Sequence, residues 1–198
     1  MLELTDGLIT IDNLDISQLR RQEIRARLVG VPQDPCFLTG TVRLNADPTH
    51  ASSDLGIVEA LKSVQLWSVV KEKGGLDADF DGVHLSHGQR QLFCLARAML
   101  RPSRVLVLDE ATSSIDARTD ALMQRVIREK FAQHTIIAVA HKLDTIVDFD
   151  RVVVLEKGEV VEVGEPYDLL EKKGSWFGQL YWSAEGGTED GENKGFDE

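Results

Sequence analysis

The four apolar residues at 105–108, followed by Asp109 and Glu110, constrain the fold more than any other feature of the sequence. An apolar run that ends in an acidic pair is typical of a strand buried on both faces, as in a parallel sheet. Along the rest of the chain, β-branched segments alternate with helical patterns. This order predicts a layered α/β fold with a largely parallel sheet. Ligands of such folds bind at the carboxyl ends of the strands, where the two carboxylates are expected.

Apolar spacing and capping residues predict the other elements. Residues 54–64 follow a serine cap signal and carry Leu55, Val58 and Leu61 at helical spacing. Further helices are predicted at 89–100, which ends before Pro102, and at 117–131, with a short one near residues 17–24. The remaining predictions are strands at 8–11 and 27–31, a second buried strand at 135–140, and a hairpin at 151–155 and 159–163 around Lys157-Gly158.

Composition limits the partners and divides the chain. After Trp182 the sequence is small, polar and acidic, so we predict one domain at 1–182 and a disordered tail at 183–198. The net charge of −11 disfavours a nucleic-acid partner, because phosphate binding needs clustered Lys and Arg. The apolar runs are far shorter than the roughly 20 residues of a spanning helix. With two cysteines and no disulfide pattern, we expect this chain alone to be soluble and cytoplasmic.

The acidic pair after the central strand has the chemistry of nucleotide hydrolysis. Asp109 would hold Mg²⁺, a cation that prefers oxygen ligands, and Glu110 would orient or deprotonate the attacking water. Successive strand residues point in opposite directions, so the two acids can have different roles. The structural alternative is an ordinary acidic turn after a buried strand.

Residues 85–89, Leu-Ser-His-Gly-Gln, lie just before a predicted helix. Helix N-termini expose unpaired amides and bind phosphates readily. Ser86 would supply a hydroxyl, and Gly88 would let the backbone approach a ligand closely. The structural alternative is a capping box, in which Ser86 caps the helix and Gln89 bonds back to it without any ligand.

Three further polar sites follow strand ends or begin a helix. Gln33 follows a predicted strand and could reach the same edge of the sheet as Asp109. His141 follows the strand at 135–140, and residues 113–116, Ser-Ser-Ile-Asp, precede the helix at 117–131. Taken singly, each has a structural alternative: a surface turn, a hydrogen-bonded histidine and a helix N-cap.

Taken together and in this order, these sites resemble the ATP-binding-cassette (ABC) ATPase family. Gln33 matches its Q-loop, residues 85–91 match its signature, and Asp109 with Glu110 matches Walker B and the catalytic glutamate. Residues 113–116, with Ser114 and Asp116, match the D-loop, and His141 matches the switch histidine. The likeness runs from about residue 2 to 181. Within the family, the chain most resembles the second nucleotide-binding domain of subfamily C, the multidrug-resistance-associated type. The residues that carry this resemblance are 32–35, 40–43, 45–48 and 89–97.

The chain departs from the family pattern in two places. His87 stands where the signature usually has Gly. No Gly-x-x-x-x-Gly-Lys-[Ser/Thr] occurs in the 198 residues, and the upstream aromatic residue that stacks on adenine is also missing. The resemblance therefore implies a P-loop NTPase-like fold with a helical signature subdomain at about 47–102, but without the N-terminal strands and the Walker A loop.

The resemblance also implies a mechanism that uses ATP and Mg²⁺. Family domains pair head to tail, and each ATP lies between Walker A and Walker B of one domain and the signature of the other. Gln33 and Asp109 would hold Mg²⁺, Glu110 would act on water, and His141 would contact the γ-phosphate. The residues that would face the partner domain or its nucleotide are Ser86, His87, Gly88, Gln89, Ser114 and Asp116.

Three functions remain open at this point. The first is part of an export ATPase that works with transmembrane domains on the cytoplasmic face of a plasma or vacuolar membrane; the isolated chain would then hydrolyse ATP poorly, because Walker A is absent. The second is a chain that lends only its signature to an intact cassette domain. The third is a soluble ABC ATPase, which the acidic charge and the lack of a coiled-coil arm disfavour.

Overall fold

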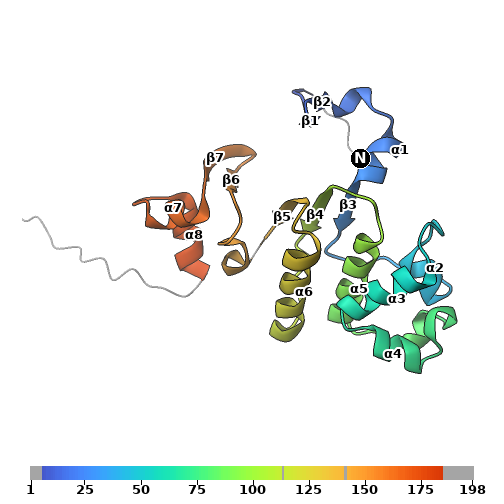
Figure 1. Cartoon of the computed structure of the whole chain (residues 1–198). Coiled ribbons are helices and arrows are strands. Elements are labelled where there is room, and N and C mark those ends of the chain that lie inside the picture. The colour runs from blue at the N-terminus through green and yellow to red at the C-terminus, as the bar shows by residue number, and fades with distance from the viewer. Residues whose placement is uncertain (1–5, 113, 141, 185–198) are drawn as a thin grey trace, which may run out of the picture. The chain divides into compact units, whose positions relative to one another are not determined.

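The computed structural model describes residues 6–112, 114–140 and 142–184. The chain divides into two compact units, Met1–Val139 and Ala140–Glu198. Figure 1 shows the elements of each unit, which are described separately below.

A three-stranded parallel sheet organises the first unit, with the strand order β3-β4-β5. These strands are Leu28–Val31, Val105–Asp109 and Thr135–Val139. The central strand β4 buries Leu106 and Leu108. The prediction of a largely parallel sheet around the strand at 105–108 is confirmed. The register places Val31 beside Leu108, so the residues that follow β3 and β4 emerge at the same edge.

Strand β5 differs from its prediction as a second buried strand. Its side chains alternate between exposed and half-buried, and Ile137 and Val139 are 52% and 53% exposed. β5 is the outer strand of the sheet, with β4 as its neighbour among the described residues. The prediction was wrong because an apolar run shows that a strand can be covered on both faces, but does not show that it is.

The N-terminal region forms a hairpin where the sequence predicted one strand at 8–11. The turn residues Asp12 and Asn13 have φ values of 53° and 64°, a left-handed conformation that Asp and Asn tolerate in two-residue hairpin turns. Leu8 and Ile9 are exposed and lie outside the strands. The elements of this region are β1 Thr10–Ile11, β2 Leu14–Asp15, the 3-10 helix η1 Ile16–Gln18 and the helix α1 Arg21–Arg27.

Five α-helices complete the first unit, and α5 lies between α3 and α6 (Figure 1). The predicted helices at 54–64, 89–100 and 117–131 are confirmed as α3, α5 and α6, and Ser53 caps α3 by accepting a hydrogen bond from Gly56 N. Two helices of five and six residues were not predicted. The helical elements are α2 Val42–Ala46, α3 Asp54–Ser63, α4 Trp67–Glu72, η2 Gly75–Asp77, η3 Asp81–Val83, α5 His87–Met99 and α6 Ala117–Lys130.

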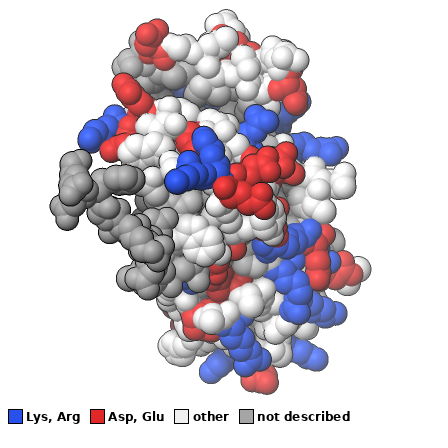
Figure 2. Space-filling view, turned by 90° about the vertical axis from the view of Figure 1, so that its left-hand side faces the viewer, with Lys and Arg blue, Asp and Glu red and all other residues white. Residues whose placement is uncertain are grey.

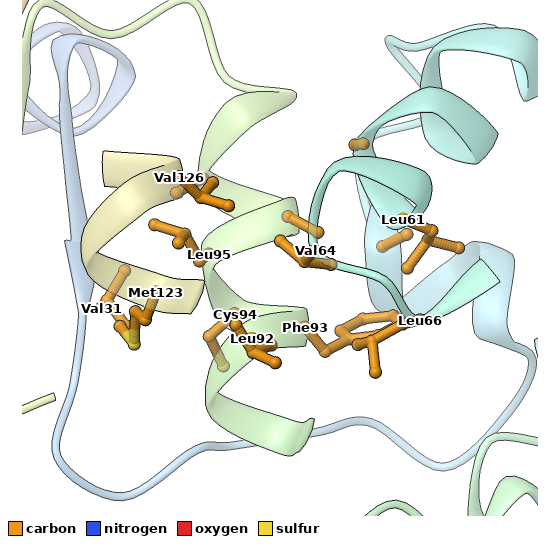
Figure 3. Close-up of a cluster of buried hydrophobic side chains, with 14 of the residues drawn as sticks. Val31, Leu61, Val64, Leu66, Leu92, Phe93, Cys94, Leu95, Met123 and Val126 are labelled. Carbon is orange, nitrogen blue, oxygen red and sulfur yellow. The ribbon is translucent and has the colours of Figure 1, made fainter. Parts of the chain in front are cut away.

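Most of the residues of helix α5 are buried, so the helix lies in the core of the first unit. Figure 3 shows Leu92, Phe93 and Leu95 of α5 among side chains from α3, α6 and β3. Burial of one such side chain contributes about 1.5–3 kcal/mol. Phe93 also packs edge-on against Phe80, with ring centroids 4.9 Å apart. This packing fixes the position of α5, and with it the position of the residues at its N-terminus.

The second unit is built on the predicted hairpin. Strands β6 and β7, Val152–Glu156 and Glu159–Gly164, pair antiparallel around Lys157 and Gly158, which both have positive φ. The sequence patterns did not predict the two helices that follow. These are α7 Pro166–Glu171 and α8 Trp176–Ala184, preceded in the unit by the 3-10 helix η4 Leu143–Ile146. Helix α8 continues two residues beyond Trp182, to Ala184, and the rest of the predicted tail lies outside the described residues.

A buried carboxylate joins β7 to the segment that leads into α8. Glu162 accepts hydrogen bonds from Lys172 Nζ at 2.9 Å, Ser175 Oγ at 2.8 Å and Phe177 N at 2.9 Å. Burial raises the pKa of this carboxyl group, but the three donors outweigh burial and lower the pKa to about 2. Glu162 is therefore ionised at neutral pH and links β7 to residues 172–177.

None of the helices described in either unit has the length and the apolar character that crossing a membrane would require.

Candidate functional site

Gln33 and Glu110 meet at the carboxyl end of the parallel sheet. Gln33 lies two residues after Val31, and Glu110 lies two residues after Leu108, the register partner of Val31. The side chain of Gln33 donates a hydrogen bond from Nε2 to Glu110 Oε2 at 2.8 Å. The prediction that Gln33 reaches the edge of the sheet that carries the acidic pair is confirmed.

The backbone at Glu110 turns sharply away from the strand. Its φ is 48°, a left-handed conformation that non-glycine residues adopt rarely and that often marks functional sites. The amide of Glu110 donates to Val139 O at 3.1 Å, so β5 also holds this turn. Two strands thus fix the position from which the carboxylate reaches Gln33.

Asp109 and Gln33 provide oxygen atoms that suit a hard divalent cation. Asp109 is exposed at the end of β4, and the amide of Gln33 keeps a carbonyl oxygen while its nitrogen faces Glu110. No group of three or more His, Cys, Asp or Glu within the described ranges is placed to hold a metal. Mg²⁺ fits such a sparse set, because it usually keeps several waters and binds through one or two protein oxygens and substrate phosphates.

The start of α5 is the capping box that the sequence allowed. Ser86 Oγ accepts a hydrogen bond from Gln89 N at 3.2 Å, and Gln89 Oε1 accepts one from Ser86 N at 3.0 Å. The predicted capping box is therefore confirmed, and the helix begins at His87, which is exposed; the role of this segment in phosphate binding stays a prediction. Both cap contacts use side-chain oxygens as acceptors, so the Ser86 hydroxyl and the Gln89 amide keep protons that suit an anionic ligand.

Gly88 is buried against α6, which adds a reason for glycine that the sequence did not show. A Cβ atom on Gly88 would lie 3.0 Å from Thr119 Cγ2 and 3.4 Å from Thr119 Oγ1. The space beside Gly88 is therefore filled by a side chain of the same chain. Glycine lets the N-terminal ends of α5 and α6 approach each other closely.

Asp116 is the N-cap of α6, as its structural alternative proposed. Its carboxylate accepts hydrogen bonds from Thr119 Oγ1 at 2.7 Å, Thr119 N at 3.0 Å and Arg118 N at 3.1 Å. The hydroxyl of Thr119 makes the largest contribution to lowering the pKa of Asp116. Thr119 thus contacts both Asp116 and Gly88, while Ser114 is exposed.

For two of the residues that sequence analysis selected, the structure gives no description. Ser113 and His141 lie outside the described residues. The role of His141 stays a prediction.

Sequence analysis placed Gln91 in the signature match but assigned no role to it or to Arg97, and both hold the segment around Gln33. The buried amide of Gln91 on α5 donates from Nε2 to the carbonyl oxygens of Pro32, at 3.2 Å, and of Gln33. Further along α5, Arg97 donates to Cys36 O at 3.1 Å, and its guanidinium carbon lies 5.1 Å from the centre of the Phe37 ring. A polar residue directly before the apolar run at 92–96 was the available sequence signal for Gln91.

Charge on the face of the molecule shown in Figure 2 is mixed. Figure 2 shows Lys and Arg interspersed with Asp and Glu on the face in view. The face in view shows no broad basic surface of the kind that nucleic acids require.

Comparisons with known proteins agree on one family. A sequence model described as "ABC transporter" matches residues 1–113. The chain is 58% identical over 184 residues to ABC multidrug transporter B of Aspergillus fumigatus, and 42% identical over 193 residues to ATP-binding cassette sub-family C member 10 of Mus musculus. These alignments cover 93% and 96% of this chain but 13% of each relative, so the chain spans about an eighth of their length.

A solved structure supports the same fold. The chain resembles a bacterial Atm1-family ABC exporter with ATP bound, with a TM-score of 0.83 and 30% sequence identity. The match covers 93% of this chain and 33% of the exporter chain. The predicted P-loop NTPase-like α/β fold is confirmed.

Proposed function

Because the chain belongs to the ABC transporter family, we propose that it provides parts of two ATP sites in an exporter of the subfamily C type. One part is the edge of the sheet with Gln33, Asp109 and Glu110. The other is the start of α5. The hydrogen bond between Gln33 and Glu110 supports this proposal most strongly, because it joins the ends of two neighbouring strands where ligands of parallel sheets bind.

At the first site, Gln33 and Asp109 would hold Mg²⁺ through oxygen atoms. The bound Mg²⁺ would neutralise charge on the phosphates of ATP. Glu110 would orient the attacking water and accept its proton, with its carboxylate held by Gln33. His141 would contact the γ-phosphate.

At the second site, the start of α5 would bind a nucleotide held by a partner cassette domain. Ser86, His87, Gly88 and Gln89 belong to this surface, with Ser114 and Asp116 beside the domain boundary. The donors left by the capping box suit phosphate oxygens. Transmembrane domains of the same transporter would convert closure and opening of the domain pair into export across a plasma or vacuolar membrane, with this domain on the cytoplasmic face.

The proposal can be tested in a chimera. This chain would replace the aligned segment of the Aspergillus fumigatus relative, and ATP hydrolysis by the purified chimera would be measured. Glu110→Gln should lower kcat by about 100-fold, the scale of one catalytic base. The matched control is Glu129→Gln, the same substitution at an exposed position of α6, which should leave hydrolysis unchanged. An active chimera that is insensitive to Glu110→Gln would overturn the proposal.

The isolated chain should not hydrolyse ATP, because the sequence has no Gly-x-x-x-x-Gly-Lys-[Ser/Thr] to hold the β- and γ-phosphates. Turnover by the purified 198-residue chain that Glu110→Gln abolishes would contradict this expectation.

The second candidate function is a chain that donates only its start of α5 to an intact cassette domain. The capping box favours it, since its hydrogen bonds lie within this chain and leave the Ser86 hydroxyl and the Gln89 amide protons for a ligand. An ATP-dependent complex with an intact cassette domain, lost on Ser86→Arg but kept on Ser68→Arg in the exposed face of α4, would support it. Sensitivity of the chimera to Glu110→Gln would exclude it as the whole function.

A further inference from the structure

A buried amide connects the start of α5 to the carboxylate at the end of β4. Gln91 is 1% exposed and lies in the second turn of α5. Burying an amide without hydrogen bonds is costly, and the two hydrogen bonds that Gln91 Nε2 donates go to one short segment. They run from Nε2 to the carbonyl oxygens of Pro32 and Gln33. The amide therefore joins α5 to the segment that leads out of β3.

The side chain of Gln33 completes the connection to Glu110. Its backbone carbonyl is held by Gln91, and its own Nε2 donates to Glu110 Oε2 at 2.8 Å. A shift of Gln91 would move the backbone of Gln33 and thereby the donor that faces the carboxylate. The contacts form a continuous series from α5 to Glu110.

Helix α5 itself connects Ser86 to Gln91. Gln91 follows Ser86 by five residues, about 7.5 Å along a helix axis. Between them the backbone is regular, beginning at the capping box of Ser86 and Gln89. Leu92, Phe93 and Leu95 hold α5 in the core, so its first turns move as one body and not residue by residue.

We propose that Gln91 is a positioning residue: when α5 shifts, Gln91 moves Gln33 and so changes the contact between Gln33 and Glu110. This proposal rests on the proposed function. A nucleotide bound at the start of α5 would thus influence the orientation of Glu110, which acts on a different nucleotide. Gln91 touches neither nucleotide and acts through Gln33.

The unpaired side-chain oxygen of Gln91 supports a role for this residue beyond packing. Gln91 Oε1 is buried and has no hydrogen-bond partner among the described residues. An unpaired buried acceptor lowers stability, and an apolar side chain of similar length would avoid this cost. Gln91→Met removes the link to Pro32 and Gln33 and keeps the volume, so we expect the melting temperature to change by less than about 4 °C.

The first experiment examines the contacts themselves in the isotopically labelled 198-residue chain. In the unaltered protein, the side-chain NH₂ protons of Gln91 should exchange with solvent far more slowly than those of the half-buried Gln124 on α6. In Gln91→Met, the NMR signals of the Gln33 side-chain amide should shift toward their positions in Glu110→Ala. Gln124→Met, the matched control, should leave them in place. Rapid exchange of the Gln91 protons, or unshifted Gln33 signals in a folded Gln91→Met chain, would overturn the proposal.

The second experiment measures hydrolysis in the chimera described above. Gln91→Met should lower kcat by about tenfold and change KM for ATP by less than about twofold, because it displaces a positioned group and leaves nucleotide binding intact. Gln91→Glu serves as a second variant, since it keeps the shape but loses the N–H donors. It should likewise lower kcat and leave KM for ATP nearly unchanged. Loss of stability alone would lower the amount of active protein, which titration of active sites would reveal. Normal kcat in both variants, with Glu110→Gln still inactive, would refute the positioning role and leave the proposed function intact; an active Glu110→Gln chimera would refute the proposed function itself.

Discussion

Replacement of Glu162 by Gln should destabilise the second unit without changing its shape. The carboxylate accepts hydrogen bonds from Lys172, Ser175 and the backbone of Phe177. Gln has nearly the same size, but it is neutral and has one acceptor oxygen where Glu162 has two. We expect the free energy of unfolding of this unit to fall by about 2 kcal/mol at pH 7.

The magnitude follows from the pKa of Glu162. The pKa is lowered from the usual 4.5 to about 2 in the folded chain. At about 1.4 kcal/mol for each pKa unit, this difference corresponds to roughly 3 kcal/mol. The side chain of Lys172 is 60% exposed, and solvent screens its share of the interaction, so about 2 kcal/mol is the more realistic figure.

The pH dependence has a defined sign. A carboxyl group whose pKa is lower in the folded state stabilises that state at pH values above the unfolded pKa. This stabilisation should be complete above pH 4.5 and should disappear as the pH falls from 4.5 through about 2. The difference in stability between the unaltered chain and Glu162→Gln should shrink over the same interval.

Tryptophan fluorescence can follow this unit alone. Of the three tryptophans, Trp176 and Trp182 lie in α8, whereas Trp67 lies in α4 of the first unit. Urea unfolding in a Trp67→Phe background therefore reports on the second unit. The matched control is Glu159→Gln at an exposed position of the same hairpin, with an expected change below about 0.5 kcal/mol. An equal loss for Glu162→Gln at pH 7 and at pH 2 would refute the reasoning.

Three other predictions concern the first unit. Phe93→Ala should lower its free energy of unfolding by about 3–5 kcal/mol in urea titrations that monitor Trp67, and a loss below about 1 kcal/mol would show that Phe93 is not central to the core. Gly88→Ala should cost about 1 kcal/mol through crowding against Thr119 Cγ2. Thr119→Ser, which removes that methyl group, should recover most of this cost in a double-mutant cycle, whereas additive effects would contradict the contact. Thr119→Val should raise the pKa of Asp116 in an NMR titration, because it removes the hydroxyl that contributes most to lowering this pKa, and an unchanged pKa would exclude that hydrogen bond.

The elements that the sequence predicted correctly are those whose local residue pattern favours the same structure as their packing in the fold. The apolar run at 105–108 became the central strand, and Lys157-Gly158 became a hairpin turn. The end of β3 and the end of β4 were correctly expected at one edge, because parallel strands direct their carboxyl ends together. The contact between Gln33 and Glu110 follows from that rule.

Features that depend on distant neighbours could not be predicted. Ile137 and Val139 have the composition of buried residues, and their exposure depends on what covers the sheet. Gly88 is required by Thr119, which lies 31 residues later in the chain and packs beside it. Gln91 was part of the signature match, but its hydrogen-bond partners became visible only when α5 was placed beside the segment after β3.

The central claim is that Ser86 and Glu110 serve two different nucleotides. Photoaffinity labelling of the chimera with 8-azido-ATP, followed by proteolysis that separates the domain containing this chain from the proposed partner domain, tests this claim most directly. Ser86→Arg should abolish the label on the partner domain and retain it on the domain that contains this chain, whereas Glu110→Gln should block hydrolysis and retain both labels. Loss of label from the same domain in both variants would contradict the account.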